Sequence, residues 1–299
     1  MIEASNITNF FTVYFAWYLT LIGILGLCIG SFLNVVIYRI PLMLKQSWRS
    51  QCLEYLEMHT EPKPEIFNLL RPRSICPHCK LPISAWQNIP LISFLILRAR
   101  CANCGKRISW RYPLVEFLTA VISIVVANHF GVSVETLAGL IFTWTLIALV
   151  FIDFDHQLLP DDVTLSLLWL GLLFSLTGIF TDPQSAIIGC IAGYVSLWVI
   201  AKLFKLVRGI EGMGYGDFKL FACLGAWLGW QMLPFILLVS TLLGAAMGIY
   251  LILFKQKSRT SAIPFGPYLA IAGWIALLYG NVIIQLYLAL LSSNSHYLY

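Results

Sequence analysis

Charged side chains are scarce in this chain of 299 residues: Asp, Glu, Lys and Arg make up only 11% of it, whereas hydrophobic residues make up 59%. The mean hydropathy is +0.83. A soluble domain of this length needs much less apolar sequence to fill its core. The scarcity of charge therefore excludes an ordinary soluble protein and predicts an integral membrane protein.

Long apolar runs account for most of the chain. A helix crosses a bilayer with about 20 apolar residues, and eight runs approach this length. We therefore predict an all-α polytopic membrane protein with about eight transmembrane helices. The expected spans are residues 14–38, 113–130, 137–154, 162–180, 185–206, 218–232, 234–254 and 265–290, and the apolar character of 218–232 is the weakest.

Lys and Arg are also absent before the first apolar run, where Glu3 is the one charged residue. A cleavable signal peptide has a basic start and a shorter apolar segment. We expect the first run to remain as a membrane anchor.

The basic residues further along the chain predict its orientation, because cytoplasmic loops are rich in Lys and Arg. Twelve of the nineteen lie between Arg39 and Arg111, and the other seven lie in 202–219 and 255–259. With eight spans, all nineteen face the cytoplasm and both termini are periplasmic. The same rule explains the net charge of +5, so we expect the bilayer as a partner and no nucleic acid.

Two acids lie at the ends of apolar runs, where a carboxylate is expensive to place. Asp153 ends the third predicted span and Asp217 precedes the sixth, so both belong to the cytoplasmic face of the bilayer. Ionisable groups at membrane depth usually mark functional sites. Two carboxylates that face each other share one proton and can activate a water. We expect Asp153 and Asp217 to form the catalytic dyad of an aspartic protease.

Neighbouring charges have simpler explanations. Asp155, Asp161 and Asp162 lie in a turn, where they would cap the next helix or contact solvent. Lys219 is expected to extend toward the membrane interface. An ion pair of Asp153 or Asp217 with Lys219 or Arg208 is the structural alternative to catalysis.

Four cysteines form two Cys-x-x-Cys pairs separated by 21 residues, Cys76 and Cys79 followed by Cys101 and Cys104. This spacing is typical of a closed, structural zinc ribbon. Iron uses the same ligand set, so both metals fit. We expect a small cytoplasmic zinc-ribbon-like module in which His78 is a solvated residue and the apolar segment 89–97 packs in the module or lies at the membrane interface.

Together these motifs resemble the bacterial type IV prepilin peptidases, also called leader peptidases/N-methyltransferases, a family of membrane aspartic proteases with a Gly-x-Gly-Asp motif. The resemblance extends over nearly the whole chain. It rests on Gly30–Val36 with Arg39 and Pro41, the two cysteine pairs, Asp153 seven residues before Pro160, Gly214–Lys219 and Pro264–Tyr268.

The resemblance implies that Asp153 and Asp217 cleave the leader of type IV prepilins and type II secretion pseudopilins at the cytoplasmic side of the bacterial inner membrane. It also implies N-methylation of the new N-terminal residue with S-adenosylmethionine. The sequence has no glycine-rich methyl-donor motif between a strand and a helix, so this second activity depends on the resemblance alone. The expected division is an anchor (1–39), a zinc-binding module (40–112) and a peptidase domain (113–299).

Two other functions are compatible with parts of the pattern. A transporter also places acids in the membrane, but near the midplane and in paired broken helices. A zinc-dependent membrane scaffold or sensor accounts for the cysteines and makes the acids structural. Peptide cleavage distinguishes both from the peptidase.

Reporter fusions test the predicted orientation. Because all Lys and Arg are assigned to the cytoplasmic side, a C-terminal reporter that works only in the periplasm should be active. Activity of a cytoplasm-only reporter at the same position would mean that the number of spans is wrong, first of all around 218–232.

Overall fold

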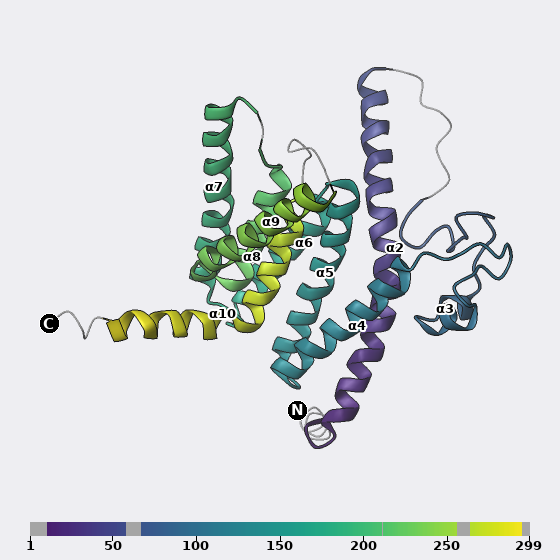
Figure 1. Cartoon of the computed structure of the whole chain (residues 1–299), viewed down its shortest axis with the longest axis horizontal. Coiled ribbons are helices and arrows are strands. Elements are labelled where there is room, and N and C mark those ends of the chain that lie inside the picture. Colours follow the sequence, from purple (N-terminus) through teal and green to yellow (C-terminus); the bar gives the residue numbers. More distant parts are fainter. Residues whose placement is uncertain (1–10, 58–66, 211, 256–263, 295–299) are drawn as a thin grey trace. The chain divides into compact units, whose positions relative to one another are not determined.

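The computed structural model describes residues 11–57, 67–210, 212–255 and 264–294 (Figure 1). These residues are almost entirely helical, and their only β-type pairs are the isolated bridges Ile75–Pro82 and Arg100–Arg107. The helices are α2 (Phe15–Tyr55), α3 (Ile92–Ile96), α4 (Arg111–Phe130), α5 (Val134–His156), α6 (Asp161–Ser175), α7 (Pro183–Arg208), α8 (Tyr215–Leu228), α9 (Leu233–Lys255) and α10 (Gly266–Asn294).

Six of the described helices, α2, α4, α5, α7, α9 and α10, are long and apolar enough to cross a membrane. The chain is thus a multi-pass membrane protein by the length and composition of its helices. The other two expected segments are helical but short, with 15 residues in α6 and 14 in α8. At 1.5 Å per residue they reach about 22 and 21 Å, less than the hydrocarbon core of about 30 Å.

Helix α2 continues well past the first predicted span. The sequence predicts a span that ends near residue 38, whereas α2 runs without a break to Tyr55 and contains Pro41. The guanidinium of Arg39, which is buried, donates to the backbone carbonyls of Asn68 (2.7 Å), Leu69 (3.3 Å) and Pro72 (2.7 Å). Arg39 therefore fastens the connector in front of the cysteines to α2.

Residues 1–152 form one compact unit. A Cβ atom on Gly26 or Gly30 of α2 would lie 2.7 Å from the Cα atom of Ala120 or Glu116 of α4. The two helices are therefore packed backbone to backbone, as small residues four apart allow in membranes. The hydrophobic core beside this contact contains Leu33, Val36, Ile37, Val115, Ile147, Ala148 and Ile152.

Residues 153–299 form the second unit, and α8 is its central element. The helix contacts α6, α7 and α10 (Figure 1), and every residue from Phe218 to Leu228 except Lys219 is buried. Gly189 of α7 meets Gly225 of α8 backbone to backbone, and a Cβ on Gly193 would lie 2.7 Å from the carbonyl oxygen of Phe221. Because protein rather than lipid surrounds α8, neither great length nor high hydropathy is required of it.

Candidate active site and metal centre

Asp153 and Asp217 lie at opposite kinds of helix end. Asp153 is in the last turn of α5 and Asp217 is in the first turn of α8. The two residues are only 5% and 9% exposed. Leu159 packs against Gly266, which lies beside Asp153, and against Gly216, the neighbour of Asp217. The fold of the second unit thus brings together two acids that are 64 positions apart in the sequence (217 − 153).

Each of these carboxylates accepts a hydrogen bond from a backbone N–H at the start of a helix. Gly266, the first residue of α10, donates to Asp153, and Gly214, the N-cap of α8, donates to Asp217. Helix N-termini carry partial positive charge and stabilise anions. The arrangement is therefore suited to hold negative charge on the pair away from water.

Glycines and one leucine fix the surroundings of the pair. A Cβ on Gly266 would lie 2.6 Å from Oδ2 of Asp153 and 3.1 Å from Cδ1 of Leu159, and a Cβ on Gly216 would lie 2.9 Å from Cβ of Leu159. Leu159 is buried. It thus packs against the glycine that contacts Asp153 and against the glycine next to Asp217, and it leaves no room for a side chain at either position.

The other acids of this region, Asp155, Asp161 and Asp162, are exposed, as predicted. They lie in the last turn of α5 and the first turn of α6, however, and the N-cap of α6 is Pro160 without a side-chain cap bond, so the predicted capping role is wrong. Lys219 has a partner that the sequence did not predict. Its ammonium binds the carboxylate of Asp161 at 2.6 Å, because α6 and α8 pack side by side and bring the two residues together. Lys219 therefore pairs with Asp161, at the surface, and α8 is tied to the start of α6.

The four cysteines of the sequence motif converge in the first unit. The sulfurs of Cys76, Cys79, Cys101 and Cys104 all lie within 4.8 Å of one another, and the sulfurs of Cys76 and Cys104 are 3.9 Å apart. A tetrahedron with metal–sulfur bonds of about 2.3 Å has edges of about 3.8 Å. The donor set fits a closed four-thiolate metal site, and His78 is exposed and outside it.

The two cysteine pairs sit in turns of the same construction. The carbonyl of Cys76 accepts from the N–H of Lys80, and the carbonyl of Cys101 accepts from the N–H of Gly105, each at 2.9 Å. Lys80 and Gly105 both have positive φ, 60° and 68°, which closes the turn. The backbone N–H of Cys79 donates to the Cys76 sulfur and lowers the pKa of the Cys76 thiol to about 6, which favours the thiolate that binds metal.

The apolar segment 89–97 is divided between packing and exposure. Phe94 is buried, and its ring packs edge-on against the ring of Trp110, with 4.8 Å between the two ring centres. Ile92, Leu95 and Ile96 are exposed. The packing expected for this segment is confirmed for Phe94, and a position of the exposed residues at the membrane interface stays a prediction.

Glu116 is a buried acid that our reading of the sequence overlooked. Its carboxylate accepts from the N–H of Leu91 at 2.9 Å and from the side chain of Ser31. Leu91 has a φ of 56°, so the bond holds a strained turn of the cysteine module against α4. The available signal was an acid inside the apolar run 113–130, the same signal that singled out Asp153.

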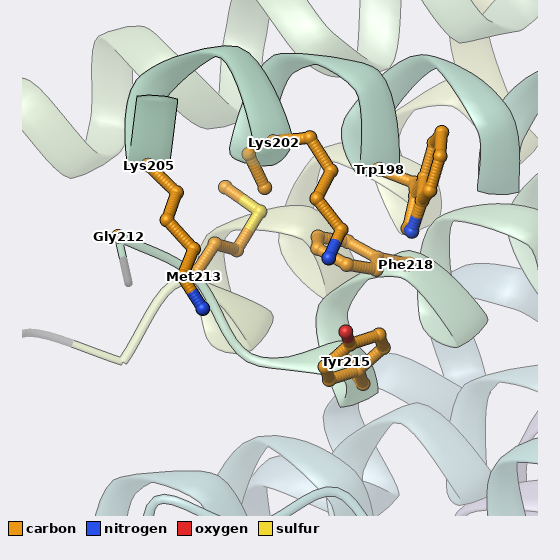
Figure 2. Close-up of a pocket in the computed structure, with 8 residues that line it drawn as sticks. Trp198, Lys202, Lys205, Gly212, Met213, Tyr215 and Phe218 are labelled. Carbon is orange, nitrogen blue, oxygen red and sulfur yellow. The ribbon is translucent and has the colours of Figure 1, made fainter. Parts of the chain in front are cut away.

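A pocket beside the start of α8 combines aromatic and basic side chains (Figure 2). It lies between the last turns of α7 and residues 212–218 and is lined by Trp198, Ala201, Lys202, Lys205, Gly212, Met213, Tyr215 and Phe218. The Lys202 ammonium lies 5.8 Å from the centre of the Trp198 ring. The pocket wall includes Phe218, the neighbour of Asp217, so a group bound here would touch the segment that carries that acid.

Comparison with known proteins gives matches over most of the chain. Residues 24–130 match the bacterial peptidase A24 N-terminal domain, and residues 140–249 match the type IV leader peptidase family. The prepilin leader peptidase/N-methyltransferase of Aeromonas hydrophila is 56% identical over 91% of this chain and 94% of its own length. The proteins of the same name from Pseudomonas aeruginosa and Legionella pneumophila are 51% and 46% identical, over 89% and 94% of this chain and 91% and 98% of their own lengths. No solved structure matches.

The metal centre can be tested by metal analysis of the purified protein. Because the four sulfurs form a closed site, we expect about one zinc per chain, and Cys76→Ser combined with Cys101→Ser should remove it and expose the module to protease. The matched control is Cys52→Ser, since Cys52 lies on α2 outside the sulfur cluster. Unchanged metal content in the double variant would refute this ligand set.

Proposed function

The chain belongs to the type IV leader peptidase family, and we propose that it acts as a prepilin leader peptidase and N-methyltransferase. The observation that carries the proposal is the buried pair Asp153 and Asp217, each with a backbone donor from a helix N-terminus. The proposed substrates are type IV prepilins and type II secretion pseudopilins. The relatives carry both activities in their names.

The proposed chemistry follows from two adjacent carboxylates. Both cannot be ionised cheaply, so the pair holds one proton. The ionised partner takes a proton from a water as that water attacks the scissile carbonyl carbon. The protonated partner polarises the carbonyl oxygen and supplies a proton for the departing amine. The pair titrates as a unit, so neither Asp153 nor Asp217 has one permanent role.

Two further groups belong to the proposal. A zinc ion held by Cys76, Cys79, Cys101 and Cys104 would fix the fold of the cytoplasmic module, since a four-cysteine shell has no open position for chemistry. S-adenosylmethionine would supply the methyl group for the new N-terminal residue. Cleavage of a prepilin in the presence of a donor with a deuterated methyl group, followed by mass measurement, would identify the donor.

The proposed location is the bacterial inner membrane, with the active site toward the cytoplasm and both termini in the periplasm. The positions of Lys and Arg support this orientation. We also propose that residues 1–39 anchor the chain, that 40–112 form the zinc-binding module, and that 113–299 carry the peptidase activity. Arg39 supports a structural role for the boundary between the first two parts, because it binds the connector at Asn68 and Pro72.

Replacement of either acid tests the proposed dyad. Asp153→Asn or Asp217→Asn keeps the size of the side chain but removes the carboxylate that accepts the proton. We expect the rate of prepilin cleavage to fall at least about 100-fold. Zinc content and the methylation of a peptide that already lacks its leader should be retained.

The matched controls are Asp155→Asn and Asp162→Asn, since both residues are exposed acids at the ends of α5 and α6 that border the connecting turn. They should cleave at close to the normal rate. Normal cleavage by Asp217→Asn would eliminate the dyad, and an equal loss in all four variants would show that the turn, and not the pair, had been damaged.

Gly266→Ala tests whether the backbone donor positions Asp153. The added Cβ would lie 2.6 Å from the carboxylate oxygen, so Asp153 must move. A displacement of about 1 Å at a reacting group can cost about 100-fold in rate, and we expect kcat to fall while KM changes little. A thermal melt verifies the fold, and a folded variant with normal kcat would show that Gly266 does not position the acid.

A further inference from the structure

The ion pair of Lys219 and Asp161 connects the beginnings of two helices. The Lys219 ammonium contacts both oxygens of the Asp161 carboxylate, Oδ1 at 2.7 Å and Oδ2 at 2.6 Å. Lys219 comes two residues after Asp217 in α8, and Asp161 is the first residue of α6. The ion pair therefore joins the part of α8 that carries Asp217 to the segment that enters α6.

Leu159, two residues before Asp161, is the contact between that segment and the proposed active site. It is buried. A Cβ on Gly216, the neighbour of Asp217, would lie 2.9 Å from the Cβ of Leu159, and a Cβ on Gly266 would lie 3.1 Å from its Cδ1. The position of Leu159 thus limits where both glycines can lie.

Pro160 makes the connection between Leu159 and Asp161 stiff. Its ring restricts φ, which is −62° here, and the residue is buried. Its carbonyl accepts from the N–H groups of Val163 (3.2 Å) and Thr164 (3.0 Å), which belong to the first turn of α6. A change in the position of Asp161 is therefore transmitted to Leu159 and is not absorbed by a flexible loop.

The ion pair contributes little to the stability of the fold. The side chain of Lys219 is 27% exposed and that of Asp161 is 55% exposed, and ion pairs in contact with solvent add little to the free energy of unfolding. The residues on either side of Lys219, Phe218 and Leu220, are buried and apolar, so they hold α8 in the core without the pair. What the ion pair adds is a fixed alignment of the first part of α8, where Asp217 lies, with the start of α6.

We propose that Asp161 and Lys219 are positioning residues for the peptidase reaction, and that their ion pair holds Asp217 at the distance from Asp153 that the reaction needs. The proposal rests on the proposed peptidase function and adds to it two residues that act through Asp217 and not on the substrate. A displacement of about 1 Å at a reacting group can lower a rate about 100-fold. An ion pair of small energetic weight in folding can therefore have a large effect on catalysis.

Removal of the ion pair tests this role in the full-length protein, in nanodiscs and with a prepilin as the substrate. The variants are Asp161→Asn, Lys219→Met and the two combined, and Lys219→Arg is the conservative variant that keeps the charge. The matched control is Asp162→Asn, which makes the same replacement at the next position of α6, at an exposed acid outside the ion pair. The measured quantities are kcat, KM, the pH dependence of kcat and the temperature of unfolding.

Each single variant without the ion pair should lower kcat about 10- to 100-fold and leave KM within about three-fold, since the substrate contacts are unchanged. The combined variant should lose no more than either single one, because the two residues act through one bond. Lys219→Arg should restore most of kcat, because a guanidinium also binds a carboxylate with two donors. The pH dependence should not shift, and the temperature of unfolding should fall by no more than about 4 °C. Asp162→Asn should behave as the unaltered protein does.

The other outcomes contradict the positioning role. Normal kcat in Asp161→Asn and Lys219→Met would show that the ion pair does not place Asp217. A pH dependence that shifts in Lys219→Met alone would mean that the lysine charge acts on the acids directly. A loss of kcat that follows the temperature of unfolding, or that occurs equally in Asp162→Asn, would mean that the start of α6 only supports the fold. All of these results leave the proposed function intact, whereas failure of the unaltered protein to cleave a prepilin would overturn that function, and the positioning role with it.

Discussion

Burial of negative charge is the constraint on which the second unit of this protein depends. An ion removed from water costs several kcal/mol unless protein groups replace its hydration. Here Gly214 and Gly266 supply backbone N–H groups to Asp217 and Asp153. Backbone donors without an intrahelical partner occur at helix N-termini, so α8 and α10 both have to begin beside the acids. The positions of these two helices thus follow from the chemistry of the pair.

The packing of α8 is a second consequence of the same constraint. The helix that carries Asp217 is surrounded by other helices, and this packing keeps the acid in its first turn away from lipid. Contact between Gly189 and Gly225 brings α7 and α8 together at backbone distance, which surrounds a helix of only 14 residues with protein. Trp227 completes this environment: its ring is buried and its N–H donates to the carbonyl of Leu167 at 2.7 Å.

Local patterns allowed much of this architecture to be predicted. The apolar runs predicted the eight longer helices, α2 and α4 to α10, and the cysteine spacing predicted that the four sulfurs converge. Both signals lie in short stretches of sequence. The continuation of α2 to Tyr55 was missed for two reasons. Its second half is polar and so is not part of an apolar run, and Pro41 is a residue that usually ends a helix. The pairing of Lys219 with Asp161 and the donor from Gly266 depend on packing between helices distant in sequence, which no local pattern encodes.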